Sequence, residues 1–197
     1  DDLDIKHGTA SIADRSGGLG GSINISNRAD WNNRLSGKYI QGLGSYSTFD
    51  EFLQLNAGNS KLQSKTRLYH NYSKNNFTFI NRGIGIPDPQ TGQIVNPVDT
   101  NDKASYKKYG LLQELYLRAG PGDIVSLRYW GQGASRSIPR ATSYEGPDNS
   151  NLNRQSDTDH RLTADWKHFS ERSTFELRSA YSFKELNYIL ENIVHGM

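Results

Sequence analysis

The sequence predicts an all-β protein built from about seven long antiparallel strands. Apolar and polar residues alternate with a period of two through most of the chain after Trp31. The alternating stretches are roughly 10–14 residues long, against about 5–6 for a soluble strand and about 9–11 for a tilted membrane strand. The connections between them alternate between short and long. Strand length therefore favours a membrane-spanning β-barrel over a sandwich.

The composition agrees with many turns and few aliphatic residues. Among 197 residues there are 19 glycines and 11 tyrosines, hydrophobic residues make up 34%, and the mean hydropathy is −0.76. Disordered chains share low hydropathy but lack aromatics, so the tyrosines argue against disorder. The formal net charge of +2 argues against a nucleic-acid partner. With no cysteine, a disulfide framework and a thiolate metal site are excluded.

Membrane insertion through helices is not predicted. No run of about 18 apolar residues occurs. A β-barrel can nevertheless have low hydropathy, because each strand exposes only one face to lipid. The acidic start Asp1–Asp4 is unlike the basic start of a secretory signal, so we expect the chain to begin inside a mature protein or to be cytoplasmic.

Within each segment the alternation places apolar residues on one face and charged residues on the other. Gln113 interrupts the apolar face. The residues expected on the apolar face are Leu35, Tyr39, Leu43, Leu53, Leu55, Ala57, Leu62, Leu68, Tyr72, Tyr109, Leu111, Leu115, Leu117, Val125, Leu127, Tyr129, Leu162, Ala164, Trp166, Phe175, Leu177, Tyr181 and Phe183. The charged residues expected on the opposite face are Lys65, Arg67, Glu114, Arg118, Arg128, Arg161, Asp165, Lys167, Glu176, Arg178 and Lys184.

The connections are predicted from turn-forming residues. Short turns are expected at 58–60, 120–123 and 170–172, and long polar segments at 76–105 and 137–158; a tight link near 45–49 stands where another long loop would belong. This alternation is typical of periplasmic turns and extracellular loops in a barrel. A large soluble sheet covered on one face would show the same strand periodicity, so periodicity alone leaves both architectures open.

A glycine-rich motif precedes the strands. Gly8, Ser11, Gly20, Gly21, Ile23, Asn24 and Ile25 match, in register, a pattern of a Gly, a Ser three residues later and a final Gly-Gly-x-Ile-Asn-Ile. This stretch resembles the end of the plug domain in TonB-dependent outer-membrane receptors. Asp14-Arg15 replaces the family's usual Tyr-Gly pair. The motif covers about the first 28 residues, and the remainder resembles the family in architecture only.

The resemblance implies a fold and a division into domains. Residues 1–28 would be the C-terminal part of the plug, and residues 29–197 the N-terminal strands of an antiparallel transmembrane β-barrel. Such receptors have about 22 strands around a plugged lumen, so about seven strands are too few to close the barrel. We therefore expect this chain to be part of a larger receptor.

The resemblance also implies a function and partners. The expected function is active import of a large, scarce nutrient, such as a ferric siderophore, haem or cobalamin, across the bacterial outer membrane. The expected partners are the inner-membrane TonB complex, the imported ligand, outer-membrane lipid and, as a candidate, a substrate-binding lipoprotein. No cofactor is expected.

Residues for ligand capture are expected in the two long segments. Arg82, Arg136, Arg140 and Tyr144 could meet an anionic or aromatic substrate, although solvated loop residues would look the same. Trp31, Tyr39, Trp166, Tyr181 and Phe183 are more typical of an aromatic girdle than of ligand platforms.

Other chemistry is not favoured by the sequence. His7, His70, His160, His168 and His195 show no metal-ligand spacing, with His160 and His168 expected on the apolar face. The Gly17–Gly21 run lacks the Lys-Ser/Thr of a P-loop, and no Ser-His-Asp or Cys-His constellation is recognisable. Two other functions stay open: a soluble or surface all-β ligand-binding module, and an adhesin or porin-like barrel without energy coupling.

Overall fold

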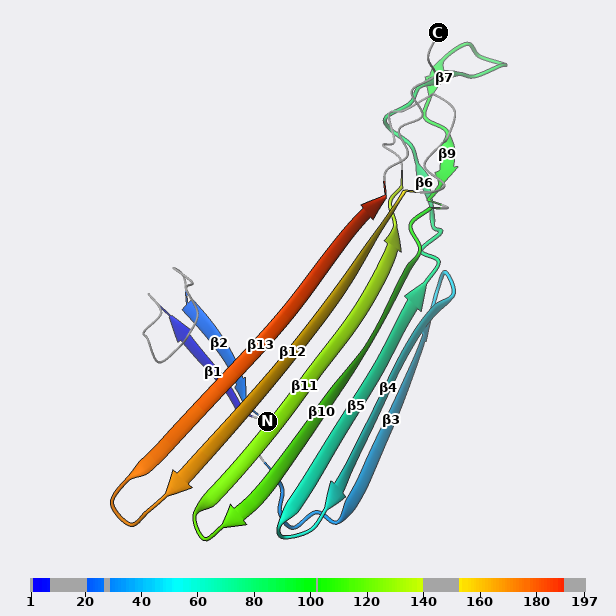
Figure 1. Ribbon diagram of the computed structural model, residues 1–197. Coiled ribbons are helices and arrows are strands. Elements are labelled where there is room, and N and C mark those ends of the chain that lie inside the picture. The colour runs from blue at the N-terminus through cyan, green and yellow to red at the C-terminus, as the bar shows by residue number, and fades with distance from the viewer. Residues whose placement is uncertain (1, 8–20, 27–28, 102, 140–152, 190–197) are drawn as a thin grey trace.

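The fold consists of β-structure throughout the residues that the computed structural model describes, which are 2–7, 21–26, 29–101, 103–139 and 153–189. Its largest unit is one antiparallel sheet of seven strands (Figure 1). In these ranges no helix has the length and apolar character needed to cross a membrane. The prediction of an all-β fold with about seven long antiparallel strands is thereby confirmed.

The large sheet is a meander in which each strand pairs with the next long strand along the chain. Its strands are 10–16 residues long. In order they are β3 (Leu35–Gly44), β4 (Thr48–Gly58), β5 (Leu62–Ser73), β10 (Tyr106–Gly120), β11 (Asp123–Ser137), β12 (Arg154–Phe169) and β13 (Thr174–Ile189).

Six shorter strands lie outside the large sheet. They form three antiparallel pairs: β1 (Asp2–His7) with β2 (Gly21–Ser26), β6 (Thr78–Ile80) with β9 (Val98–Thr100), and β7 (Ile86–Pro87) with β8 (Ile94–Val95). The Ile-Asn-Ile end of the glycine-rich motif forms β2, and no strand was predicted for its partner β1. The segment 76–105 was expected to be loop, but it contains four short strands. The second long segment was predicted to extend to residue 158, but residues 154–158 belong to β12.

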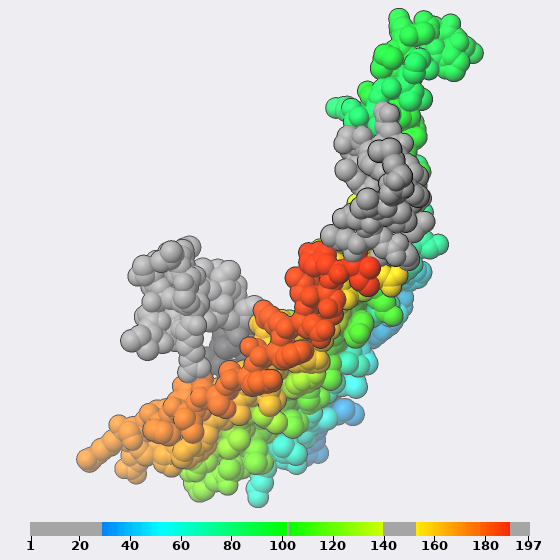
Figure 2. All heavy atoms as spheres, turned by 45° about the horizontal axis from the view of Figure 1, so that its top comes forward, coloured from blue at the N-terminus to red at the C-terminus, as the bar shows by residue number. Residues whose placement is uncertain are grey.

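The two ends of the sheet carry different connections. Short turns join β4 to β5, β10 to β11, and β12 to β13 at one end, hereafter the short-turn end (Figure 1). The strand ends that the two long connections join, from β5 to β10 and from β11 to β12, lie at the other end, the long-loop end. The described residues between β5 and β10 project beyond the sheet (Figure 2). The tight link between β3 and β4 is also at this end: Gly44 pairs with Thr48, and two of the three residues between them, Tyr46 and Ser47, have left-handed φ values of 61° and 55°.

Specific residues fix the short turns. Between β4 and β5, the Asn59 side-chain oxygen accepts hydrogen bonds from the backbone N–H groups of Lys61 and Leu62, at 2.8 and 2.9 Å. Between β10 and β11, Gly122 has φ +86°, and a Cβ there would lie 2.3 Å from the Phe169 carbonyl oxygen. Glycine is therefore required at this turn by both conformation and space.

The register sorts the side chains of the seven strands onto two faces, because paired residues point to the same side of a sheet. Leu115 pairs with Leu127, Leu127 with Ala164, and Ala164 with Ser179. This face, the apolar face, carries every residue that the sequence predicted for it. The opposite face, the charged face, carries all eleven charged residues predicted for it, from Lys65 to Lys184.

Burial is the reverse of that in a soluble sheet with one face packed on a core. On the apolar face, Leu127 is 40% exposed, Phe175 53% and Leu177 57%. On the charged face, Glu114 is 0% exposed and Asp165 8%, and Tyr116 is the one buried hydrophobic residue of the described chain. No second layer covers the apolar face among the described residues, and the closest packing occurs among polar side chains.

Candidate functional site

A line of ion pairs crosses the charged face from β5 to β13, and we call it the charge ladder. It is defined by Arg67, Glu114, Arg128, Asp165, Arg178, Glu176 and Lys167. The sign of the side-chain charge alternates from one strand to the next, from Arg67 on β5 to Arg178 on β13. The last pair, between Glu176 on β13 and Lys167 on β12, returns to the preceding strand. Period-two alternation supplies these groups on every strand, and the strand register brings them into contact.

Glu114 on β10 is the centre of the first half of the charge ladder. Arg67 on β5 donates to its carboxylate at 2.5 Å, and Arg128 on β11 lies 3.8 Å from its other oxygen. The Tyr116 hydroxyl donates to Glu114 at 3.0 Å, and the Arg128 guanidinium lies 5.4 Å from the centre of the Tyr116 ring. A buried carboxylate needs such partners, because its desolvation would otherwise be strongly unfavourable.

Asp165 on β12 is the centre of the second half. Arg128 donates to one of its oxygens, and Arg178 on β13 lies 2.9 Å from the other. Arg178 also pairs with Glu176, which lies 3.5 Å from Lys167. Arg128 thus joins Glu114 and Asp165, so the charge ladder is continuous across five strands.

A smaller cluster lies nearer the long-loop end of the same face. Asp159 pairs with Arg161 at 3.1 Å and with Lys184 at 3.5 Å. The Arg161 guanidinium covers the Trp130 ring at 4.7 Å. Together with the charge ladder, this cluster makes the charged face a polar wall that can contact another charged or hydrogen-bonding body.

Gln113 is a polar residue on the apolar face, and its side chain forms hydrogen bonds with residues of the neighbouring strand β5. Its side-chain oxygen accepts from the Thr66 hydroxyl at 2.6 Å, and its nitrogen donates to the Ser64 hydroxyl at 2.9 Å. All three residues lie on neighbouring strands β10 and β5. The amide therefore does not depend on solvent for its hydrogen bonds.

The predicted capture residues are not gathered into one site. Arg82 is exposed in the connection after β6, beyond the large sheet. Arg136 is exposed near the end of β11, where its Nε donates to Gln155 at 3.1 Å. Arg140 and Tyr144 lie outside the described residues, so their placement stays a prediction.

The predicted plug motif is described only in part. Gly8, Ser11 and Gly20 lie outside the described residues. Gly21, Ile23, Asn24 and Ile25 belong to β2, which pairs with β1. Of the aromatic residues considered as a girdle, Tyr39, Trp166, Tyr181 and Phe183 are exposed on the apolar face. Trp31 differs, because it precedes β3 and the Arg118 guanidinium covers its ring at 4.3 Å.

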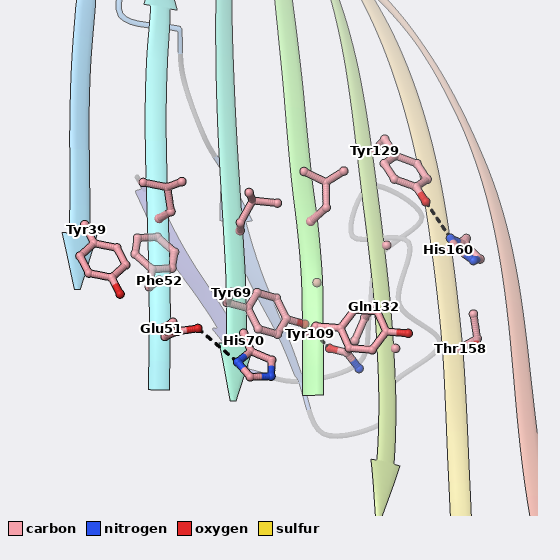
Figure 3. A pocket seen from close by; sticks show the side chains of 16 residues that line it. Tyr39, Glu51, Phe52, Tyr69, His70, Tyr109, Tyr129, Gln132, Thr158 and His160 are labelled. Carbon is pink, nitrogen blue, oxygen red and sulfur yellow. Dashed lines mark hydrogen bonds and ion pairs between the residues drawn. The ribbon is translucent and has the colours of Figure 1, made fainter. Parts of the chain in front are cut away.

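A depression of about 620 Å³ lies on the apolar face towards the long-loop end (Figure 3). Its polar residues include Glu51, His70 and Tyr109, and its apolar wall includes Leu68 and Leu111. Glu51 and His70 form a pair at 3.2 Å. The sequence reasoning missed this site, although one signal was available: Gly131 and Gly133 leave two successive gaps among the large residues of the apolar face.

The described ranges contain no group of three or more His, Cys, Asp or Glu residues arranged to hold a metal ion. Comparison with known proteins gives no further guide to the chemistry. No protein-family description matches the chain, and no curated protein matches it as a relative.

Proposed function

We propose that this chain is part of a TonB-dependent receptor of the bacterial outer membrane, with residues 1–28 in the plug domain and residues 29–197 in the transmembrane β-barrel. The observation that carries the proposal is the exposed apolar face. Leu127, Phe175 and Leu177 are exposed on strands long enough to cross a bilayer.

The charged face supports the same assignment. In a plugged barrel the inner side of the wall contacts polar plug residues and water rather than lipid. The charge ladder holds Glu114 and Asp165 with little exposure by pairing them with arginines on neighbouring strands. A soluble sheet would instead place its charged side chains in bulk water and its apolar side chains against a second layer.

The connections and edges agree with an unclosed portion of a barrel wall. Short turns at one end and long connections at the other are typical of outer-membrane barrels. Within the described chain, β3 and β13 each pair with a single neighbour. A membrane would require partners for their remaining backbone N–H and C=O groups, since none can bond to lipid. We propose that further strands of the same receptor supply them.

Under this proposal the long connections face the cell exterior and take part in ligand capture. Arg82 and Arg136 are the described candidates, and both are exposed. The imported ligand would be a ferric siderophore, haem or cobalamin. The TonB complex, through the plug, would provide the energy for transport, with outer-membrane lipid around the barrel and a substrate-binding lipoprotein as a candidate partner.

Fractionation of cells expressing the full-length protein tests membrane insertion. We expect the protein in the outer-membrane fraction, resistant to alkaline extraction and dependent on detergent for monodispersity. A protein that is monodisperse in plain buffer would instead support the soluble or surface ligand-binding module.

Uptake by whole cells tests energy-coupled import. We expect a deletion strain to lose accumulation of one labelled cargo among a ferric siderophore, haem and cobalamin. We also expect a protonophore to abolish that uptake in the parent strain. Uptake that is unchanged by the protonophore would favour a porin-like barrel without energy coupling.

A further inference from the structure

The segment 29–34, hereafter the linker, joins the N-terminal residues to β3 at the short-turn end of the sheet (Figure 1). It contains no strand, yet side chains of β5 and β10 hold it in place. The linker is the covalent connection between residues 1–28 and the seven-stranded sheet. Any pull on residues 1–28 that their other contacts do not bear therefore reaches the sheet through it.

Gln63 on β5 holds the linker through its buried side-chain amide. The residue is 1% exposed, and its Nε2 donates to the backbone carbonyl oxygens of Asn33 and Asn59, both at 2.9 Å. Both hydrogens of the amide nitrogen are thus used, one on the linker and one on the turn between β4 and β5. Gly58 leaves room for this side chain, because a Cβ there would lie 2.7 Å from Gln63 Cδ.

Arg118 on β10 holds the linker through the Trp31 ring. Its guanidinium lies 4.3 Å from the centre of that ring, in a cation–π contact. The same guanidinium donates to the Ser60 carbonyl oxygen at 3.2 Å. Arg118 therefore joins the linker to the turn between β4 and β5, as Gln63 does from the neighbouring strand.

The linker lies against the charged face of the sheet. The Asn33 side-chain amide donates to the Ser36 hydroxyl at 2.7 Å, and the Asn56 amide donates to the same oxygen at 3.1 Å. Gln63 pairs directly with Tyr116, a residue of the charged face. The chain thus reaches β3 from the side that the proposed barrel turns towards its plugged interior.

We propose that Gln63 and Arg118 are positioning residues that anchor the linker to the barrel wall and carry the tension that reaches it through the plug. These two side chains and the groups they hold, Trp31 and the Asn33 carbonyl, form the linker anchor. Tension acts on β5 and β10, which each pair with two neighbours, before it reaches the end of the β3–β4 ladder. The inference rests on the proposed division into plug and barrel, because only then does import pull on residues 1–28.

Pulling at constant force on the full-length protein in a supported bilayer tests the proposal. The protein is held by its N-terminus, and the lifetime of the linker on the wall is measured once the plug has unfolded. Detachment of residues 29–34 should appear as a separate step of about 20 Å, at about 3.3–3.6 Å per extended residue. Forced detachment is governed by a rate, so the lifetime reports the anchor directly.

Two substitutions remove different parts of the linker anchor. Gln63→Glu keeps the size of the side chain but replaces its two donors with an acceptor, and we expect the lifetime to fall at least about tenfold. Trp31→Ala leaves the sheet unaltered and removes the ring beneath Arg118, so the lifetime should fall severalfold. Trp31→Phe keeps a ring there and should recover most of that loss.

Gln155→Glu is the matched control, because Gln155 is also a buried glutamine of the charged face, and its side chain bonds to Arg136 and Asp157 rather than to the linker. Its linker lifetime should equal that of the wild type. The absence of a separate step in the wild type, or equal lifetimes in the wild type, Gln63→Glu and Trp31→Ala, would overturn the proposal. So would an equal loss in Gln155→Glu.

The two proposals fail in different ways. An inserted protein whose linker lifetime does not respond to Gln63→Glu and Trp31→Ala contradicts the linker anchor alone. A protein that stays monodisperse in plain buffer and does not insert contradicts the barrel, and with it the role of the linker anchor in import.

Discussion

The apolar and charged faces of the seven-stranded sheet belong to the same strands, yet they hold their side chains in different ways. On the apolar face, large side chains such as Leu127 and Leu177 are exposed and neighbouring polar groups pair sideways, as Gln113 does with Thr66. On the charged face, Glu114 and Asp165 are buried among arginines. The difference indicates that the buried contacts between side chains of this sheet are ionic and hydrogen-bonded rather than apolar. Two predictions test that contrast, and two more compare the sheet with the connection at its long-loop end; they follow from the largest expected effect to the smallest.

The first prediction places a charge on the apolar face, at Leu127 of β11. Leu127→Arg should lower the free energy of unfolding of the full-length protein in lipid vesicles by about 2–4 kcal/mol, because an arginine in the middle of a bilayer is poorly solvated. Urea titration measures the change. Ala180→Arg, at an exposed position on the charged face of β13, is the control and should change it by less than about 0.5 kcal/mol.

Equal, small effects of these two substitutions would indicate that Leu127 meets water. The two faces would then share one solvent, and the membrane proposal would fail.

The second prediction interrupts the charge ladder. Arg128→Met removes the side chain that joins Glu114 to Asp165, although each carboxylate keeps a second arginine. We expect a loss of about 1–3 kcal/mol in unfolding free energy, as for a buried acceptor left with too few donors. Arg161→Met is the matched control, since its pair with Asp159 is more exposed and should contribute only about 0–1 kcal/mol. Similar losses from both variants would contradict the claim that the charge ladder stabilises the fold more than the exposed pair of Arg161 and Asp159 does.

The third prediction compares the two ends of the sheet. Gly122→Ala forces a left-handed alanine against the Phe169 carbonyl and should destabilise the folded protein by at least about 1–2 kcal/mol. Gly92 also has a positive φ, of 67°, but a Cβ there meets nothing within 4 Å. We expect Gly92→Ala to perturb only the connection between β7 and β8, with no change in the midpoint of global unfolding. An equal shift of the midpoint in both variants would show that the connection unfolds together with the sheet.

The fourth prediction concerns Asp88 in that same connection. Backbone N–H groups of Thr91 and Gln90 donate to its carboxylate and hold the pKa of Asp88 below its ordinary value of 3.8. A lowered folded-state pKa contributes stability above the unfolded pKa, and this stability is lost as the pH falls through the folded pKa. Amide hydrogen exchange should therefore show the Gln90 and Thr91 amides losing protection only in that acidic range. Asp88→Asn should remove the pH dependence, and an unchanged profile in this variant would contradict the assignment.

Much of the fold could be predicted because period-two alternation identifies which residues share a face within one strand. This was sufficient to assign Leu177 and Phe175 to one face and Arg178 and Glu176 to the other, and turn-forming residues located most of the connections. The alternation does not identify pairing between distant segments, so β1 was missed. It also does not locate short strands such as β6 and β9, which a polar, turn-rich composition conceals.

By itself, the sequence determined the β class, the number of long strands and the separation of apolar from charged side chains, because these depend on local alternation and turn chemistry. Only the tertiary structure decided which side chains meet across strands. The register brings Arg67 to Glu114 and aligns Glu51, His70 and Tyr109 in one row. A shift of one residue between neighbouring strands would move each side chain of the shifted strand to the opposite face. The ion pairs of the charge ladder and the lining of the depression would then be lost.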